Sequence, residues 1–285
     1  MPPVPADPAD RSRLTVRFWG VRGSIPTPHK GFLGVGGNTS CVEVRAADGT
    51  TLVLDAGTGA RELGYALAAR AAGDDAELHV ALSHFHWDHL QGLPFFAPLY
   101  TAGQTVRFYA ATEVPRLRSF LRGQMSFPYF PVPFGELAAE MDIVCVEAGV
   151  PFRVGPMTVR PFPVCHPHGA HGYRVEADGA AVVYATDYEH GSPAHDAGLR
   201  EVAAGADLLI SDAQYTPDEY ALRVGWGHTT WEQATDLAAE AGVGRLLLFH
   251  HDPSHDDATL ARLLDRARER FPATDLAVEG LEIRL

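Results

Sequence analysis

Three histidines and an aspartate stand within six positions of the stretch LSHFHWDHLQG, directly after an apolar run. Such a run, ELHVALSH over 77–84, is typical of a buried strand. A loop at the end of a strand can turn neighbouring side chains toward one point. Imidazoles and carboxylates are the ligands that suit zinc and its first-row neighbours, so the stretch predicts a metal site. Its candidate ligands are His84, His86, Asp88 and His89.

One short loop cannot complete the coordination of two metal ions, so further ligands are expected at the ends of other strands. Three apolar runs end in a suitable residue: PFPVCH ends in His166, VVYATD in Asp187 and RLLLFH in His250. Taken singly, a strand-terminal Asp is usually a turn residue and a lone His is usually a hydrogen-bonded surface group. Their recurrence at the same kind of position favours one shared metal centre.

The remaining pattern is one of strands with helices between them. Strands are expected at 14–20, 40–46, 51–57, 152–166, 172–177, 180–187, 206–215 and 245–251, and helices at 60–72, 231–241 and 256–270. This pattern predicts two packed sheets with helices outside. We expect a disordered leader at 1–12 and a single domain at 13–285, in which the irregular, aromatic and proline-rich segment 115–140 is a lid or dimer insert.

Composition limits the partners. The chain has 23 Lys and Arg against 36 Asp and Glu, a formal net charge of −13, so extended nucleic acid is not an expected partner. Its three cysteines lie outside any CxxC pattern, which favours a reducing cytoplasm over a disulfide framework. No apolar run approaches the roughly 18 residues of a membrane span, so a membrane partner is not expected either.

The motifs HFHWDH, CH, ATD and FHH, in that order, resemble those of metallo-β-lactamase-fold hydrolases. The segments WGVRGSIPTP, GGNTSC, LVLDAGTGARELG and GHTT are similar to the ribonuclease Z and cyclic-nucleotide phosphodiesterase branch of that family. The resemblance runs from about residue 17 to the last residue, 285. It implies an α+β fold, the αββα sandwich, in which two packed mixed β-sheets carry helices on their outer faces.

The resemblance also distributes the predicted ligands over two divalent metal ions, zinc by expectation and manganese as the alternative. One ion would take His84, His86 and His166, the other Asp88, His89 and His250, and Asp187 would bridge them. His251 competes with His250 for the last position. Asp55, in LVLDAG, would orient a ligand imidazole, and a plain turn aspartate is the other interpretation.

A phosphodiester needs an acid that protonates its departing oxygen. In WGHTTWEQ, both Thr229 and Thr230 fit the first position of a capping box, so His228 directly precedes a helix. A helix N-terminus disfavours imidazolium, and the histidine therefore needs a carboxylate partner. The resemblance points to Asp212 for this partner, although the related proteins usually carry Glu there. Asp88, His228 and Asp212 form the predicted catalytic set, with a plain helix-flanking role for His228 as the alternative.

Substrate contacts are expected from two regions. The loops RGS and GGNTS offer backbone and side-chain donors for a phosphate, namely Ser24, Asn38, Thr39 and Ser40, or they simply form turns and begin a strand. In SFPYFPVPF, Phe127 and Tyr129 could stack on a base. A subunit interface explains these aromatics equally well, and a homodimer is expected.

The sequence therefore predicts a dinuclear metal-dependent phosphodiesterase that hydrolyses a small phosphodiester, with 3′,5′-cyclic nucleotides favoured. A tRNA 3′-end-processing endonuclease of the ribonuclease Z type is one alternative. The insert offers only Arg116, Arg118 and Arg122 as a basic group, which argues against it. A thioester or lactone hydrolase using the same metals is the other alternative.

Overall fold

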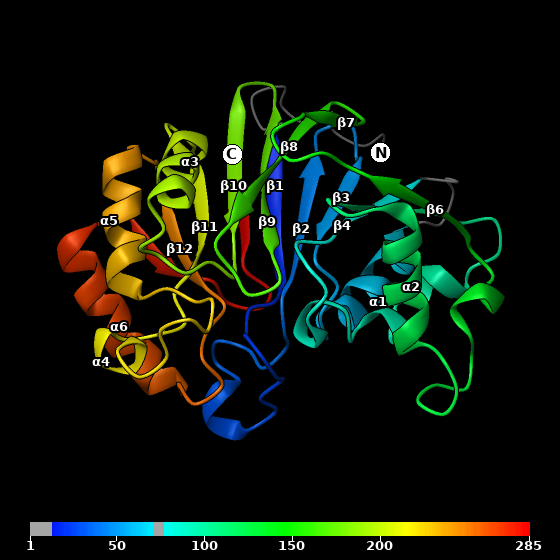
Figure 1. Cartoon of the computed structure of the whole chain (residues 1–285), viewed down its shortest axis with the longest axis horizontal. Helices are drawn as coiled ribbons and strands as arrows, with labels where there is room; N and C mark the ends of the chain where they lie inside the picture. Colours follow the sequence, from blue (N-terminus) through cyan, green and yellow to red (C-terminus); the bar gives the residue numbers. More distant parts are fainter. Residues whose placement is uncertain (1–12, 71–76) are drawn as a thin grey trace, which may run out of the picture.

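The computed structural model describes residues 13–70 and 77–285, so the leader predicted at 1–12 lies outside the described residues. Two seven-stranded mixed sheets pack face to face, with helices on the outer side of each (Figure 1). This arrangement confirms the predicted α+β class and the αββα sandwich. Within the described residues, no helix combines the length and the apolar character that crossing a membrane requires.

The first sheet has the order β14-β1-β2-β3-β4-β5-β6. Neighbours are antiparallel from β14 to β3 and parallel from β3 to β6. Its strands are β1 (Leu14–Gly20), β2 (Cys41–Ala46), β3 (Thr51–Leu54), β4 (Leu78–Ala81), β5 (Thr105–Ala110), β6 (Glu140–Cys145) and β14 (Glu282–Arg284).

The second sheet repeats this plan, with the order β13-β12-β11-β10-β9-β8-β7. Neighbours are parallel from β13 to β10 and antiparallel from β10 to β7. Its strands are β7 (Phe152–Val154), β8 (Met157–Val164), β9 (Ala170–Ala177), β10 (Ala180–Ala185), β11 (Leu208–Asp212), β12 (Leu246–Phe249) and β13 (Thr274–Leu276).

Helices cover the outer face of each sheet. Helices α1 (Ala60–Arg70) and α2 (Val114–Gln124) flank the first sheet, while α3 (Pro193–Ala203), α5 (Trp231–Ala241) and α6 (Asp257–Arg270) flank the second, with the short α4 (Pro217–Tyr220) near its end (Figure 1). One buried apolar cluster fills the space between the sheets, and a second packs the first sheet against α1 and α2. Short 3-10 turns lie at Lys30–Phe32, Trp87–His89, Leu93–Phe95, Ala97–Tyr100 and Phe134–Glu136.

The parallel strands of both sheets carry the candidate site residues at their carboxyl ends. Asp55 directly follows β3 and His250 directly follows β12, whereas Asp187 is the second residue after β10. All three have left-handed backbone angles, with φ of 60°, 54° and 58°. A non-glycine residue in this region costs ~1–3 kcal/mol, and such strain gathers at functional sites. The chain leaves each strand abruptly there, which places the side chain at the sheet edge.

The structure corrects several expected boundaries. The insert expected to be irregular at 115–140 begins within a helix, α2 (Val114–Gln124), because Pro115 suits a first helical turn and apolar residues recur at helical spacing. The strand expected at 152–166 is the hairpin β7–β8, since Gly155, with φ of 52°, makes a turn there. Strands β5, β6, β13 and β14 and helices α3 and α4 were not anticipated. Whether 115–140 acts as a lid or dimer insert stays a prediction.

Candidate metal centre

All seven predicted ligand residues meet at the edge where the two sheets come together. They form two groups, and within each group one ligand atom per residue lies within 4.8 Å of the others. The first group is His84, His86 and His166, and the second is Asp88, His89, Asp187 and His250. These groups coincide with the two ligand sets expected from the sequence, with Asp187 counted in the second.

The carboxylate of Asp187 lies between the two groups. Its Oδ1 is 3.8 Å from His84 Nε2 and 3.9 Å from His166 Nε2. Its Oδ2 is 3.1 Å from His89 Nε2 and 3.2 Å from His250 Nε2. Each oxygen therefore faces a different group, which is the placement that a ligand shared by two metal ions requires.

The centre is buried and contains polar atoms that lack partners. His89 and His250 are fully buried, and Asp187 is 1% exposed. Within the described residues, Nε2 of His84 and Nε2 of His89 are buried and make no hydrogen bond. Leaving a buried polar atom unsatisfied costs about 1–3 kcal/mol. A metal ion that these two nitrogens bind through their lone pairs would remove that cost. The donor set therefore fits divalent cations.

The charge states of the predicted ligands also favour divalent cations. Burial holds the pKa of His84 well below its usual value, so its imidazole is neutral and has a lone pair to offer. Burial would raise the pKa of Asp187, but His250 and His89 outweigh it and hold the pKa of this carboxyl well below its usual range. His89 and His250 do the same for the pKa of Asp88. Buried carboxylates need compensating positive charge, and divalent ions supply it.

A second layer of hydrogen bonds orients the imidazoles. Nδ1–H of His89 donates to Asp55 Oδ2 at 2.8 Å, and Nδ1–H of His166 donates to the carbonyl oxygen of Gly227 at 2.8 Å. Nδ1–H of His250 donates to Gln214 Oε1 at 2.9 Å. Each of these bonds leaves Nε2 directed at the centre, as ligand histidines require.

Asp55 is the most heavily bonded of these partners. Besides His89, it accepts the backbone N–H of Ser83 at 2.7 Å, the Ser83 hydroxyl at 2.8 Å and the Tyr184 hydroxyl at 2.8 Å. A turn aspartate would bond its own loop, whereas these donors come from the loop after β4 and from β10. The geometry supports the orienting role over the turn role.

Two contributors were missed by sequence reasoning. Gln214, two residues after β11, had no distinguishing type or spacing, and only its place beside His250 reveals it. Gly23 is the other: a Cβ added there would lie 2.5 Å from the His250 ring. Its glycine identity therefore makes room for that ring.

The choice between the adjacent histidines follows from their partners. His251 donates its Nε2–H to the carbonyl oxygen of Ala277 at 2.9 Å and belongs to neither group. Burial, followed by the positive charge of Arg22, lowers the pKa of His251 to about 3, so it is a neutral packing residue. The structure brings His250 to the centre instead.

His228 stands at the border of the centre. Its Nδ1–H donates to Asp212 Oδ2 at 2.9 Å, so the shorter acid does reach the histidine. Asp212 Oδ1 also accepts the backbone N–H of Thr229 at 3.1 Å, and Thr230 caps α5 by accepting the N–H of Gln233. Burial lowers the pKa of His228, but Asp212 outweighs burial and raises it to about 9. The His228 ring stacks on His250 at 5.0 Å.

The residues predicted to contact a phosphate do not all offer free donors to the centre. Ser24 is exposed, and its backbone N–H donates to Asp88 Oδ2 at 2.7 Å. Asn38 is bonded to Glu279 and Thr39 exchanges hydrogen bonds with Thr58, so these two side chains serve the local fold. Ser40 is buried, and its hydroxyl makes no hydrogen bond to the described residues.

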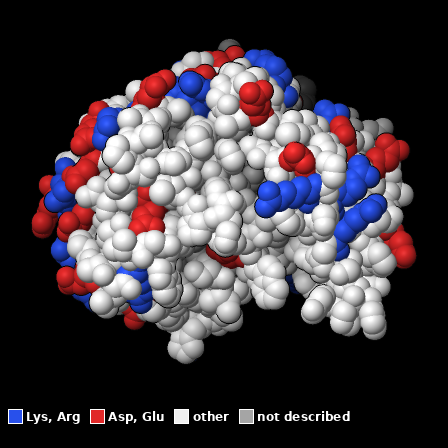
Figure 2. Space-filling view, viewed as in Figure 1, with Lys and Arg blue, Asp and Glu red and all other residues white. Residues whose placement is uncertain are grey.

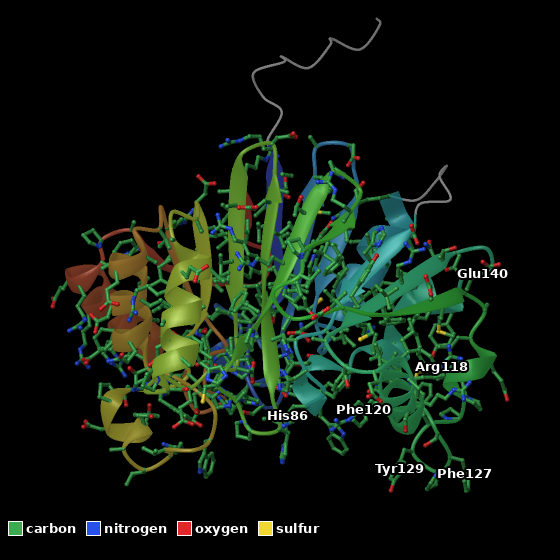
Figure 3. The ribbon with its side chains drawn as sticks, turned by 45° about the horizontal axis from the view of Figure 1, so that its top comes forward. His86, Arg118, Phe120, Phe127, Tyr129 and Glu140 are labelled. Carbon is green, nitrogen blue, oxygen red and sulfur yellow. The ribbon has the colours of Figure 1, made fainter. Side chains whose placement is uncertain are left out.

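The predicted stacking aromatics lie apart from the centre. Phe127 and Tyr129 are 92% and 82% exposed, at the tip of a loop that projects away from His86 (Figure 3). In this conformation neither ring covers the histidine cluster.

Replacing Asp55 by Asn keeps the side-chain size but removes the anionic acceptor of His89. We expect metal affinity to fall by about 10–100-fold, because an unanchored imidazole is a poorer ligand. Competition with a fluorescent chelator measures this change. Asp207→Asn, at a carboxylate that accepts only the backbone N–H of Ala181 among the described residues, is the control. Equal affinity in the Asp55 and Asp207 variants would contradict the orienting role.

Glutamine substitutions separate the adjacent histidines. His250→Gln should retain fewer metal ions per chain than the parent, because Gln places no imidazole nitrogen at the second group. His251→Gln should retain the full content, because Gln can still donate to Ala277. Elemental analysis after dialysis gives the metal content, and thermal melting checks that both variants fold. The opposite order of metal loss would assign the ligand to His251.

Comparison with known proteins places the chain in a family. Residues 50–251 match the family described as the beta-lactamase superfamily domain. Ribonuclease BN of Escherichia coli is 27% identical over 249 residues, covering 70% of this chain and 78% of that protein. An uncharacterized protein of Mycobacterium leprae is 33% identical over 222 residues, covering 74% of this chain and 70% of that protein.

Solved structures share the fold. The metallo-β-lactamase fold protein YhfI from Bacillus subtilis superposes with a TM-score of 0.69 at 20% identity, covering 96% of this chain and all of that one. A diphosphatase of the PhnP family superposes with a TM-score of 0.68 at 21% identity, covering 96% of this chain and 98% of that one. The chain thus belongs to the beta-lactamase superfamily and is a hydrolase of the metallo-β-lactamase fold.

Proposed function

We propose that the protein is a dinuclear metal-dependent phosphodiesterase that acts on a small phosphodiester. The observation that carries the proposal is the His228–Asp212 pair beside the two ligand groups. Hydrolysis of a phosphodiester needs activation of water, neutralisation of phosphoryl charge and protonation of an alkoxide. The ligand groups suit the first two tasks and the pair suits the third.

The ligand set would hold two divalent ions, one at each group, with Asp187 between them. When bound, such ions would activate water and neutralise charge on a phosphoryl oxygen. His84 and His166 offer Nε2, as do His89 and His250, because their Nδ1 atoms bond to protein partners. Burial excludes bulk water from the carboxylates and so strengthens their hold on cations.

His228 provides the acid. Its Nδ1–H is committed to Asp212, which leaves Nε2–H to donate to the departing oxygen. The charge of Asp212 keeps the imidazolium form, with a pKa raised to about 9. After the donation, Asp212 holds the neutral ring in the same orientation.

The alternatives keep the same ligand set. The name of ribonuclease BN favours a nuclease, and RNA is itself a polymer of phosphodiesters. The net charge of −13 argues against a long polyanion. A thioester or lactone hydrolase would not depend on His228. Zinc as the ion, 3′,5′-cyclic nucleotides as the substrate, a homodimer and a cytoplasmic location remain predictions from the sequence.

Substitution of His228 by Ala tests the acid role. We expect kcat/KM to fall by about 100-fold or more for a phosphodiester with an alkoxide leaving group, and far less for bis(p-nitrophenyl) phosphate, whose p-nitrophenolate departs without a proton. The measurement is a set of rates across leaving groups of increasing pKa. Unequal losses support the acid, whereas an equal loss for all leaving groups would contradict it.

Two controls make this comparison specific. His195→Ala removes a histidine that bonds Ser192 at the start of α3 and belongs to none of the metal-ligating groups. It should leave the rates unchanged. Asp212 and His228 also form a possible ligand group with His250, so the metal content of His228→Ala must be measured. Full metal content shows that the loss does not arise from a missing ligand.

A further inference from the structure

A cavity of about 330 Å³ adjoins the first ligand group. Three segments form its walls: the loop after β4, the end of β5 with α2, and the loop between β8 and β9. His84 and His86 are among its lining residues, so it opens onto the first ligand group of the metal centre. Its volume is at the lower end of the range for small-molecule sites, which suits one nucleotide better than a polymer.

Arg116 and Phe120 of α2 line this cavity. They are four residues apart and so share one face of the helix. The Arg116 guanidinium carbon lies 5.3 Å from the Phe120 ring centroid, and Phe120 packs against Phe85 with ring centroids 4.6 Å apart. Phe85 belongs to the loop that carries His84 and His86, so Phe120 packs directly against the loop that supplies these two predicted ligands.

Arg116 has no carboxylate within ion-pair distance among residues 13–70 and 77–285, although acidic residues outnumber basic ones in this chain. Figure 2 shows basic side chains gathered over the half of the molecule that carries α2. A guanidinium presents a planar fork of donors that matches phosphate, and it is weakly hydrated. An unpaired one at the wall of a cavity beside a phosphodiester centre is a site for a second anionic group.

Building on the proposed function, we infer that the substrate is a nucleotide with a second phosphate, which binds Arg116 while the nucleoside lies against Phe120. The scissile phosphate occupies the metal centre beside His86. A cyclic mononucleotide has a single phosphate and leaves Arg116 without an anionic partner. The inference therefore favours a linear nucleoside bisphosphate unit over the cyclic nucleotide expected from the sequence.

Two chromogenic substrates that differ by one phosphate test this inference. Thymidine 5′-(p-nitrophenyl phosphate) and its 3′-phosphorylated form share the scissile bond and the leaving group. The metal-loaded protein should hydrolyse the 3′-phosphorylated form with about tenfold higher kcat/KM, as expected for one charge-assisted contact. Arg116→Met should abolish this preference. The ratio of two substrates within one variant is insensitive to a general loss of activity.

Arg118→Met is the matched control. Arg118 is exposed on the same helix and does not line the cavity. Because it is two residues from Arg116, it lies on another face of the helix. Phe120 and His86 both line the cavity, and Figure 3 labels them together with Arg118. The control should keep the full preference. Equal ratios for the parent, Arg116→Met and Arg118→Met, or no preference in the parent, would overturn the inference.

The inference and the proposed function fail in distinguishable ways. Absence of bis(p-nitrophenyl) phosphate turnover with metal bound would refute the phosphodiesterase. Calorimetry with thymidine 3′,5′-bisphosphate and thymidine 5′-monophosphate then still tests the second-phosphate site. Tighter binding of the bisphosphate, lost in Arg116→Met and kept in Arg118→Met, supports it, and equal binding overturns it. A tetranucleotide that binds more tightly than the bisphosphate would overturn the single-nucleotide assignment.

Discussion

Two oxygens of one buried carboxylate, that of Asp187, face two separate sets of histidines. A carboxylate can remain ionised at this depth only if positive charge surrounds it, and the surrounding imidazoles can serve as ligands only if they are neutral. Divalent cations satisfy both conditions at once. The need to bring these groups together explains why strands from both sheets end at one edge.

The architecture meets this need through its near-repeated sheet order. Each sheet has parallel strands whose carboxyl ends meet the opposing sheet at that edge, and left-handed residues at Asp55, Asp187 and His250 end the strands sharply. The second layer then fixes the rings: Asp55 holds His89, and Gln214 holds His250. Side chains from distant parts of the chain thus determine the orientation of each imidazole.

Much of this could be predicted from the sequence because ligands at strand ends leave a local signal. The run HFHWDH and the terminal residues His166, Asp187 and His250 were visible as apolar runs that end in donors. Gln214 and the cavity beside Arg116 were not, because both depend on contacts between segments far apart in the chain. Local pattern likewise missed α2, where prolines and aromatics near residues 127–134 masked the helical spacing before them.

The proposed function requires that Asp187 and the two histidine groups hold two metal ions, and metal stoichiometry tests this requirement most directly. Elemental analysis of the parent protein and of Asp187→Ala, after equal exposure to zinc and dialysis, gives the number of ions per chain. We expect two ions in the parent and one or none in the variant, with the fold retained. One ion in the parent, or two ions held equally by both proteins, would contradict it.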